Sequence, residues 1–130
     1  MIPRISYKRK KSNTFQILDI NIKNFNQELK NIFKINEDIY IGLNFFIDKN
    51  YSDIMVNIQI FENNSCIFKS NINDSLSQFD QNFKKGYYFT KVKIPKFFLK
   101  SGEYIIKSSM GIANSAKSDT PNKILSFIIE

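Results

Sequence analysis

The sequence predicts an all-β protein, an antiparallel β-sandwich of about eight strands with jelly-roll or immunoglobulin-like connections. Short segments rich in Ile, Val, Phe and Tyr alternate apolar and polar residues, which is the period of a half-buried strand. Turn-forming residues separate these segments at intervals of roughly 8–15 residues. No segment shows the period of an amphipathic helix of normal length. The Cys–Trp–Cys pattern of immunoglobulin domains is absent, because the chain has 1 Cys and 0 Trp.

Three strands are expected in the first third of the chain. Residues 14–22 alternate nearly regularly, apart from the additional apolar Leu18. Residues 33–35 are a short apolar segment that predicts a second, brief strand. Residues 39–47 carry β-branched and aromatic residues almost throughout, so they are the strongest strand of the chain.

A hairpin is expected next. Residues 54–61 alternate clearly and predict its first arm. Asn63 and Asn64 follow, and Asn tolerates positive φ better than most residues, so they predict the turn. Residues 66–70 would then pair back as the second arm.

The second half of the chain is expected to contain three more strands. Proline has no amide hydrogen to donate, so Pro95 should end the first of them, and Ser101-Gly102 should turn the chain before the next. A polar loop before these strands holds at most a short turn of helix around Leu76 and Phe79. The expected strands are 87–94, 103–113 and 123–129, and the expected loops are 71–85 and 114–122.

Basic residues are concentrated at the amino terminus. The formal charge of +7 comes from 19 Lys and Arg against 12 Asp and Glu. Residues 1–13 carry five cations and no acid, which leaves 14 − 12 = +2 for residues 14–130. We interpret 1–13 as a solvated basic tail or linker and 14–130 as the sandwich domain. Contact with acidic lipid headgroups or with another domain is the alternative, and nucleic acid is not expected, since no RNP, KH or helix-turn-helix pattern appears.

Several kinds of chemistry are excluded by composition. Without histidine there is no Ser-His-Asp triad, Cys-His dyad or histidine-ligated zinc site. Cys66 alone makes neither an internal disulfide nor a CxxC metal site. No apolar segment approaches the roughly 18 residues of a membrane-spanning helix. We therefore expect a protein that is not an enzyme and that uses no cofactor or metal.

Residues 14–130 resemble one known protein family. The segment 94–104 combines Pro95, Leu99, Gly102 and Tyr104, and an alternating strand follows it. This order resembles the C-terminal domain of Wzt-type ATPases, which energise ABC exporters of bacterial O-antigen and related polysaccharides. Four other segments agree with that family in order. They are residues 17–20, 33–39, 62–71 and 125–129.

The resemblance implies a carbohydrate-binding β-sandwich that recognises the end of a polysaccharide during export and lipopolysaccharide biosynthesis. Its partners would be the transporter ATPase and membrane components. It would be located at the cytoplasmic side of the inner membrane. Asn36 and Asn64 stand where the family often has Gly, and the chain lacks the Walker A pattern. An excised or free-standing recognition domain is therefore implied, with the basic tail as the remnant of an interdomain linker.

The resemblance also implies a homodimer, formed by exchange of the terminal strand 123–129. The candidate dimer residues are Ile124 and Ile128. Apolar residues on the outer side of a strand favour burial of that side against another chain.

A glycan-binding face follows from the alternation of the strands. One face of each sheet is buried, and the other presents aromatic rings among amides and lysines. Rings pack against the C–H face of a sugar, while amides and ammonium groups hydrogen-bond to its hydroxyls. Gly42 should leave a hollow between its neighbours. The alternative is that the same exposed sheet is a protein–protein interface. The candidate residues are Tyr40, Asn44, Phe46, Asn57, Gln59, Phe61, Tyr87, Phe89, Lys91 and Lys93.

Overall fold

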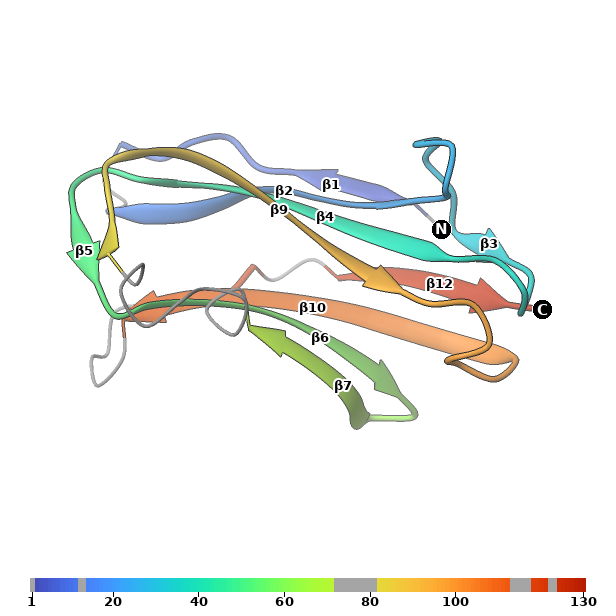
Figure 1. The fold of residues 1–130 in the computed structure, drawn as a ribbon. Helices are drawn as coiled ribbons and strands as arrows, with labels where there is room; N and C mark the ends of the chain where they lie inside the picture. Colours follow the sequence, from blue (N-terminus) through green and yellow to red (C-terminus); the bar gives the residue numbers. More distant parts are fainter. Residues whose placement is uncertain (1, 12–13, 72–81, 113–117, 122–123) are drawn as a thin grey trace.

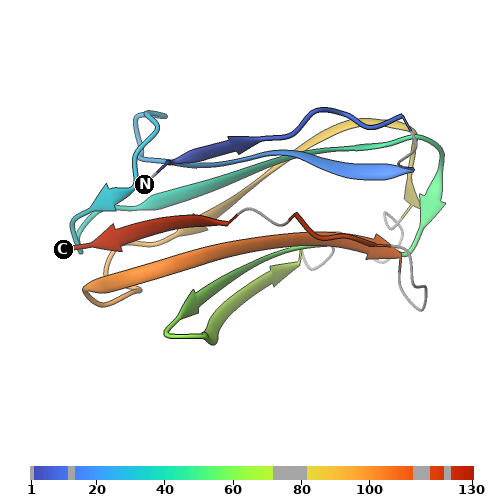
Figure 2. The same cartoon turned by 180° about the vertical axis from the view of Figure 1, so that it is seen from behind.

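Two β-sheets pack face to face in the computed structural model, which describes residues 2–11, 14–71, 82–112, 118–121 and 124–130 (Figure 1). The view from behind shows the same two elongated layers (Figure 2). In these ranges there is no helix long and apolar enough to cross a membrane. The expected all-β sandwich is confirmed.

Sheet A is entirely antiparallel and has the strand order β1-β2-β4-β9. Its strands are β1 (Arg4–Ser6), β2 (Phe15–Lys23), β4 (Ile39–Ile47) and β9 (Gly86–Ile94). β4 lies at the centre and pairs along its whole length with both neighbours, so its side chains define the middle of each face.

Sheet B has the order β3-β12-β10-β6-β7, and the short β11 also pairs with β10. The β3–β12 pair is parallel and the other pairs are antiparallel. A separate two-stranded pair is made by β5 and β8. The bounds are β3 (Ile32–Phe33), β5 (Tyr51–Ser52), β6 (Ile54–Glu62), β7 (Ser65–Asn71), β8 (Asn82–Phe83), β10 (Gly102–Ile112), β11 (Ser118–Asp119) and β12 (Leu125–Ile129).

The core lies between the two sheets and follows the alternation of the strands. Leu43 from β4 and Ile60 from β6 are completely buried. At one end of sheet B the ring of Tyr104 stacks on Phe127, with centroids 5.2 Å apart. The Tyr104 hydroxyl donates a hydrogen bond to the carbonyl of Lys100 at 2.6 Å. The Pro–Leu–Gly-x-Tyr segment therefore covers the core at the end of the sandwich where the chain crosses from β9 in sheet A to β10 in sheet B.

A β-bulge interrupts the alternation of β2. The pairing with β4 shifts between Ile17 and Asp19, so Leu18 is the additional residue. Before the bulge odd-numbered residues face the core, and after it Ile20 and Ile22 do. The bulge therefore directs Asp19 and Asn21 to the outer face of sheet A.

The predicted strands agree closely with β2, β4, β6, β7, β9, β10 and β12, whereas the predicted strand 33–35 overlaps β3 only at Phe33. The predicted turn is also confirmed, since φ is 51° at Asn63 and 67° at Asn64. Asn36, the other position where the resembled family has Gly, does not have positive φ.

Four short strands lie outside the predicted ones, namely β1, β5, β8 and β11. β1 lies within the predicted solvated tail and pairs with β2. β8 lies in the predicted loop 71–85, and β11 in the predicted loop 114–122. Strands of two or three residues are too short to show alternation, so periodicity misses them. The helical turn expected around Leu76 and Phe79 lies outside the described residues.

The terminal strand β12 pairs with β10 and β3 of its own chain. Ile124 precedes it and is 47% exposed, whereas Ile128 is half-buried beside Ile32. Dimer formation by strand exchange stays a prediction.

Candidate functional site

The ten residues predicted to bind a glycan lie on two opposite faces of the sandwich. β4 and β9 are neighbours in sheet A, but β6 belongs to sheet B, because the chain crosses between the layers after β4. The expectation that these strands form one continuous patch is therefore wrong. Sheet A carries Tyr40, Asn44, Phe46, Tyr87, Phe89, Lys91 and Lys93, and sheet B carries Asn57, Gln59 and Phe61.

A polar hollow of about 420 Å³ lies on the outer face of sheet A. Its lining comes from all four strands of the sheet and from the turn that follows β2. Predicted and unpredicted residues meet here, since Asn44 and Phe89 join a charged cluster from β1 and β2. The lining residues are Arg4, Asp19, Asn21, Lys23, Gln27, Leu29, Asn44 and Phe89.

Strand register explains why these residues meet. Ser6 lies opposite Asp19, Asp19 opposite Asn44, and Asn44 opposite Phe89. Directly opposed side chains on one face of an antiparallel pair have Cβ atoms about 4.5–5.5 Å apart. A row of four side chains therefore crosses the sheet from its β1 edge to its β9 edge.

Asp19 is the centre of this row and is only 5% exposed. Its Oδ1 accepts hydrogen bonds from Arg4 Nε at 2.7 Å and from Ser6 Oγ at 2.6 Å. Its Oδ2 accepts from Asn21 Nδ2 at 2.8 Å and from Asn44 Nδ2 at 3.4 Å. Burial alone would raise the pKa of Asp19, but the hydrogen bonds from Ser6, Arg4 and Asn21, with the charge of Arg4, lower it. Asp19 is therefore a carboxylate at neutral pH and orients the side chains around it.

Gly42 forms part of the floor beneath this cluster. A Cβ atom at this position would lie 2.7 Å from Oδ1 of Asn21, its cross-strand partner. The hollow expected at Gly42 thus exists, but the amide of Asn21 fills it. Glycine is favoured here by the close approach of the Asn21 side chain and not by backbone conformation.

Aromatic and cationic side chains surround the hollow. Phe89 is 60% exposed. The Lys91 Nζ lies 5.2 Å from the ring centroid of half-buried Tyr40, and the exposed ring of Phe25 lies 6.5 Å from the same ring. Lys93 lies opposite Tyr40, with its Nζ 3.9 Å from Asp38 Oδ2. Among the predicted residues, Asn44 and Phe89 line the hollow, and the rest of its polar floor was not predicted.

Phe46 faces outward as predicted but is only 1% exposed. The Arg9 guanidinium lies 4.2 Å from its ring centroid, in a cation–π contact. Gln16 holds the covering segment, accepting from the Lys10 amide and donating to the Lys8 carbonyl, both at 2.8 Å. Phe46 is therefore not available to a ligand in this structure. Tyr87 beside it remains 70% exposed.

The three candidates on sheet B lie in a different environment. Asn57 Oδ1 accepts a hydrogen bond from Ser109 Oγ at 2.9 Å, and the Lys107 Nζ lies 4.6 Å from the Phe61 ring centroid. A hollow of about 480 Å³ next to Phe61 is also lined by Ile105 and Ile124. This face is more apolar than the outer face of sheet A.

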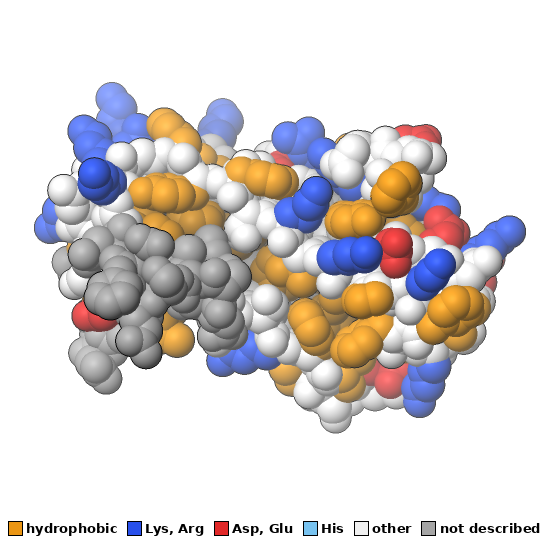
Figure 3. All heavy atoms as spheres, in the orientation of Figure 1, with side chains coloured by type: hydrophobic (Ala, Val, Ile, Leu, Met, Phe, Trp, Pro, Cys, Tyr) orange, Lys and Arg blue, Asp and Glu red, His pale blue; other side chains and the backbone are white. Residues whose placement is uncertain are grey.

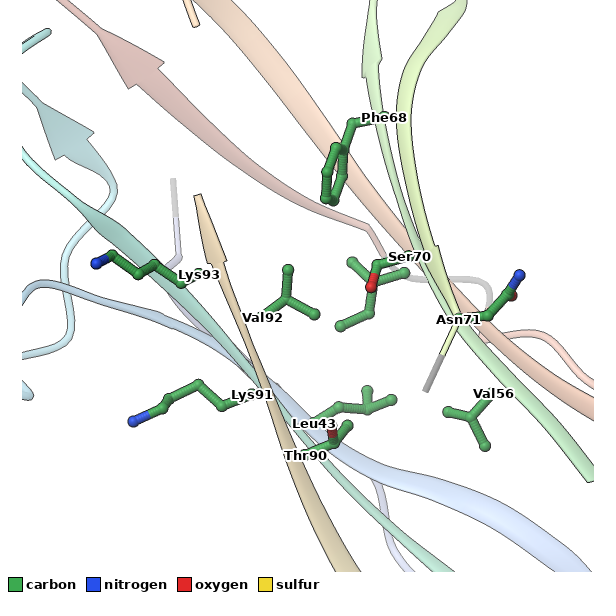
Figure 4. Close-up of a pocket in the computed structure, with 10 residues that line it drawn as sticks. Leu43, Val56, Phe68, Ser70, Asn71, Thr90, Lys91, Val92 and Lys93 are labelled. Carbon is green, nitrogen blue, oxygen red and sulfur yellow. The ribbon is translucent and has the colours of Figure 1, made fainter. Parts of the chain in front are cut away.

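A third hollow, of about 390 Å³, opens between the two sheets where β9 and β7 form the edges (Figure 4). Leu43, Val56 and Val92 line it, so much of its wall is the side of the hydrophobic core. Lys91 and Lys93 also belong to the lining, but Figure 4 shows both side chains extending away from the apolar residues. The two predicted lysines therefore point toward the outer face of sheet A and not into this cleft.

Sequence reasoning missed Arg4, Asp19 and Asn21. One signal was present, because Asp19 is the single charged residue in the mostly apolar segment 15–22. An acidic side chain in such a position is buried only when hydrogen-bond donors or a cation compensate for its charge. Its partners come from β1, which was interpreted as a tail, so the cluster was not recognised.

Comparison with solved structures identifies the fold. The chain is similar to the crystal structure of the C-terminal domain of Wzt, with a TM-score of 0.70 and 12% sequence identity. The similarity covers 98% of this chain and 77% of that chain. The expected resemblance is therefore confirmed at the level of the fold. No protein-family model matches the sequence, and no curated protein matches it.

Proposed function

We propose that this chain binds the end of a bacterial O-antigen-type polysaccharide at the hollow on the outer face of sheet A and does not alter it. The observation that carries the proposal is the position of Phe89, an exposed ring beside a polar, pre-formed floor. Sugar sites combine an apolar ring face with a few fixed donors and acceptors.

Each part of the hollow has a separate role. Phe89 offers a platform for the C–H face of a sugar ring. Arg4 uses Nε on Asp19, and its side chain is 55% exposed, so its remaining N–H groups donate to sugar oxygens. Asn44 supplies an amide with both donor and acceptor capacity. Asp19 already accepts four hydrogen bonds, so it positions these groups and is not itself the main ligand.

A hollow of about 420 Å³ falls at the small end of ligand sites, which suits a chain end. Because the site is shallow and polar, we expect a Kd on the order of 10 μM to 1 mM. The chain has no histidine, so it has neither a histidine general base nor a nucleophile that a histidine activates. Recognition without catalysis is therefore the proposed activity.

The biological setting is proposed from the fold. The sandwich shared with the C-terminal domain of Wzt supports a role in polysaccharide export by an ABC transporter, with the ATPase and membrane components as partners. The domain would act on the cytoplasmic side of the inner membrane, before the polysaccharide is exported.

A single substitution tests the site. Phe89→Ala should lower affinity at least about tenfold, which corresponds to the loss of one ring contact of about 1.4 kcal/mol. Binding would be measured on an array of bacterial O-polysaccharides and by ¹⁵N-NMR titration with the best of them. Phe61→Ala is the matched control, because it removes a ring from the opposite face. Equal losses for the two variants, or unmoved peaks on β4 and β9, would exclude the site.

A second candidate function is assembly through the outer face of sheet B. Ile32, Ile67 and Ile124 of this sheet and its flanking segment are each more than 40% exposed, and exposed apolar side chains on one face favour a protein interface. A homodimer is the proposed partner arrangement. Light scattering at several concentrations measures it, and a monomer at every concentration would remove this candidate.

A further inference from the structure

The two ends of the elongated sandwich differ in charge. At the end that contains β3 and the β9–β10 turn, lysines lie beside acids. Lys30 Nζ is 2.8 Å from Glu37, Lys93 Nζ is 3.9 Å from Asp38 and Lys100 Nζ is 3.9 Å from Glu62. The opposite end, where β5 lies (Figure 1), carries exposed lysines and an arginine instead.

Three segments meet at this second end, which we call the basic end. Arg9 contacts Phe46 and Tyr87, and the Lys85 amide donates to Asn50 Oδ1 at 2.9 Å. The Asp48 amide donates to the Thr14 carbonyl at 2.8 Å. These contacts bring residues 8–11, 48–50 and 84–87 together. The cations of the basic end are Lys8, Arg9, Lys10, Lys11, Lys49, Lys84 and Lys85, and all seven are exposed.

The basic end keeps an excess of positive charge. Its acids among the described residues are Asp48, Asp53 and Asp119, which gives 7 − 3 = +4. Within the described ranges none of the seven cations lies in an ion pair. Figure 3 shows Lys and Arg side chains gathered at this end of the upper layer. Unpaired like charges repel each other, so an external anionic partner would stabilise this arrangement.

We propose that the basic end docks on an anionic lipid bilayer. Six of its seven cations are lysines, which act as hydrated point charges on long stems and need no fixed geometry of acceptors. Tyr87 stands among them with 70% of its surface exposed, and tyrosine is enriched where proteins meet the headgroup region. Anionic headgroups attract such clusters strongly at short range.

Nucleic acid fits these observations less well. A nucleic-acid site tracks the phosphate backbone along a stripe or groove. The cations here come from three segments at one end of the sandwich, and the hollow on the outer face of sheet A has its own carboxylate, Asp19. Cations gathered at one end suit a planar surface. The inference does not depend on glycan binding, because it uses other residues.

Docking through the basic end would orient the sandwich on the membrane. Asn44 in the hollow and Lys49 at the basic end are five residues apart along β4 and its extension, or roughly 17 Å at 3.4 Å per residue. The hollow would then stand above the headgroups and face sideways, open to a polysaccharide chain.

Flotation of the full chain with vesicles tests the proposal. Vesicles of phosphatidylcholine with phosphatidylglycerol should retain the protein at low salt and release it at high salt, and pure phosphatidylcholine should not retain it. The triple variant Lys8→Glu, Lys11→Glu, Lys84→Glu should lose at least about tenfold in the partition coefficient. The control triple Lys34→Glu, Lys69→Glu, Lys96→Glu changes net charge equally, using exposed lysines elsewhere, and should retain most of the binding.

Three results would overturn the proposal. Equal losses in the two triples would mean that only net charge matters. Failure of the wild-type chain to bind phosphatidylglycerol vesicles at low salt would remove the bilayer as the partner. Binding of an oligo(dT) strand without vesicle binding would assign the basic end to nucleic acid. Circular dichroism and urea unfolding of each triple confirm that it is folded.

Discussion

Asp19 links the stability of sheet A to the composition of the proposed site. Its carboxylate gathers Arg4, Ser6, Asn21 and Asn44 within hydrogen-bonding distance. A buried carboxylate without partners would be costly, so these donors compensate for its burial. The same donors form the floor and one wall of the hollow. A residue that stabilises the fold therefore also fixes the geometry of recognition.

The lowered pKa of Asp19 predicts a specific pH dependence of stability. Because the folded-state pKa is below the unfolded one, the unfolded chain takes up the proton first as pH falls. The free energy of unfolding gained from Asp19 is therefore present above about pH 4 and lost as pH falls through the folded-state pKa. Asp19→Asn should cost about 1.5–3 kcal/mol at pH 7.

Urea unfolding of wild type and Asp19→Asn at several pH values, from neutral pH to about two units below the reference pKa of Asp, would measure the difference in their free energies of unfolding. The gap between the two proteins should begin to narrow near the unfolded-state pKa of about 4 and should close as pH falls through the lower folded-state pKa of Asp19. A gap that stays constant down to the lowest pH would contradict the assignment of the charge to this cluster.

A second prediction concerns the effect of substituting Gly42 on the free energy of unfolding. In Gly42→Ala the new Cβ would lie 2.7 Å from Asn21 Oδ1, so the Asn21 side chain must turn away and weaken its bond to Asp19. We expect a loss of about 1–2 kcal/mol in the free energy of unfolding. Asn21→Ala removes the clash, so adding Gly42→Ala to it should cost little. A double-mutant cycle in urea unfolding measures this coupling, and additive losses would refute it.

Among the elements, β1 has the most direct influence on the site. It supplies Arg4 and Ser6 to Asp19, and Ile5 packs against the core. Removing residues 1–7 should therefore lower the free energy of unfolding by about 2–4 kcal/mol and weaken polysaccharide binding at least about tenfold. Removing only residues 1 and 2 is the control, because Ile2 is 67% exposed. Urea unfolding and NMR titration follow both effects, and a shortened chain with unchanged stability would show that β1 is dispensable.

Long strands were predictable from sequence, and the covering segments were not. β4 and β9 alternate over nine residues each, so the inward and outward sides follow from periodicity alone. The apolar Leu18 already broke the alternation of β2, and the structure identifies that break as the bulge. The burial of Phe46 depends on Arg9, 37 positions earlier in the sequence, and no local pattern reports such a contact.

The same limit explains why the polar floor was missed. Periodicity assigns a side to each residue, but it does not say which strands are neighbours. Phe61 and Phe89 both point outward, yet they belong to different sheets. Only the pairing of β1 with β2 and of β4 with β9 brings Arg4, Asn44 and Phe89 around one hollow.

At the scale of the whole molecule, the proposed activities use separate surfaces. The hollow lies on the outer face of sheet A, the exposed isoleucines lie on the outer face of sheet B, and the hydrophobic core separates the two faces. A ligand on one face therefore leaves the other free. Assembly, if it occurs through sheet B, would place two sugar sites on the outside of one particle, and two linked sites raise the avidity for a repeating polysaccharide.

This separation predicts independent effects of substitutions on the two faces. Ile124→Lys places a charge on the exposed isoleucine of sheet B and should shift self-association toward the monomer, because burial of that charge is costly. It should leave the affinity for a short oligosaccharide unchanged, whereas Phe89→Ala should weaken that affinity and leave self-association unchanged. In the double variant each property should change by the same amount as in the corresponding single variant, within about 0.5 kcal/mol, as expected for distant sites. Light scattering and NMR titration of the three variants measure both properties. Weaker oligosaccharide binding by Ile124→Lys would instead show that a second copy of the chain contributes to the site.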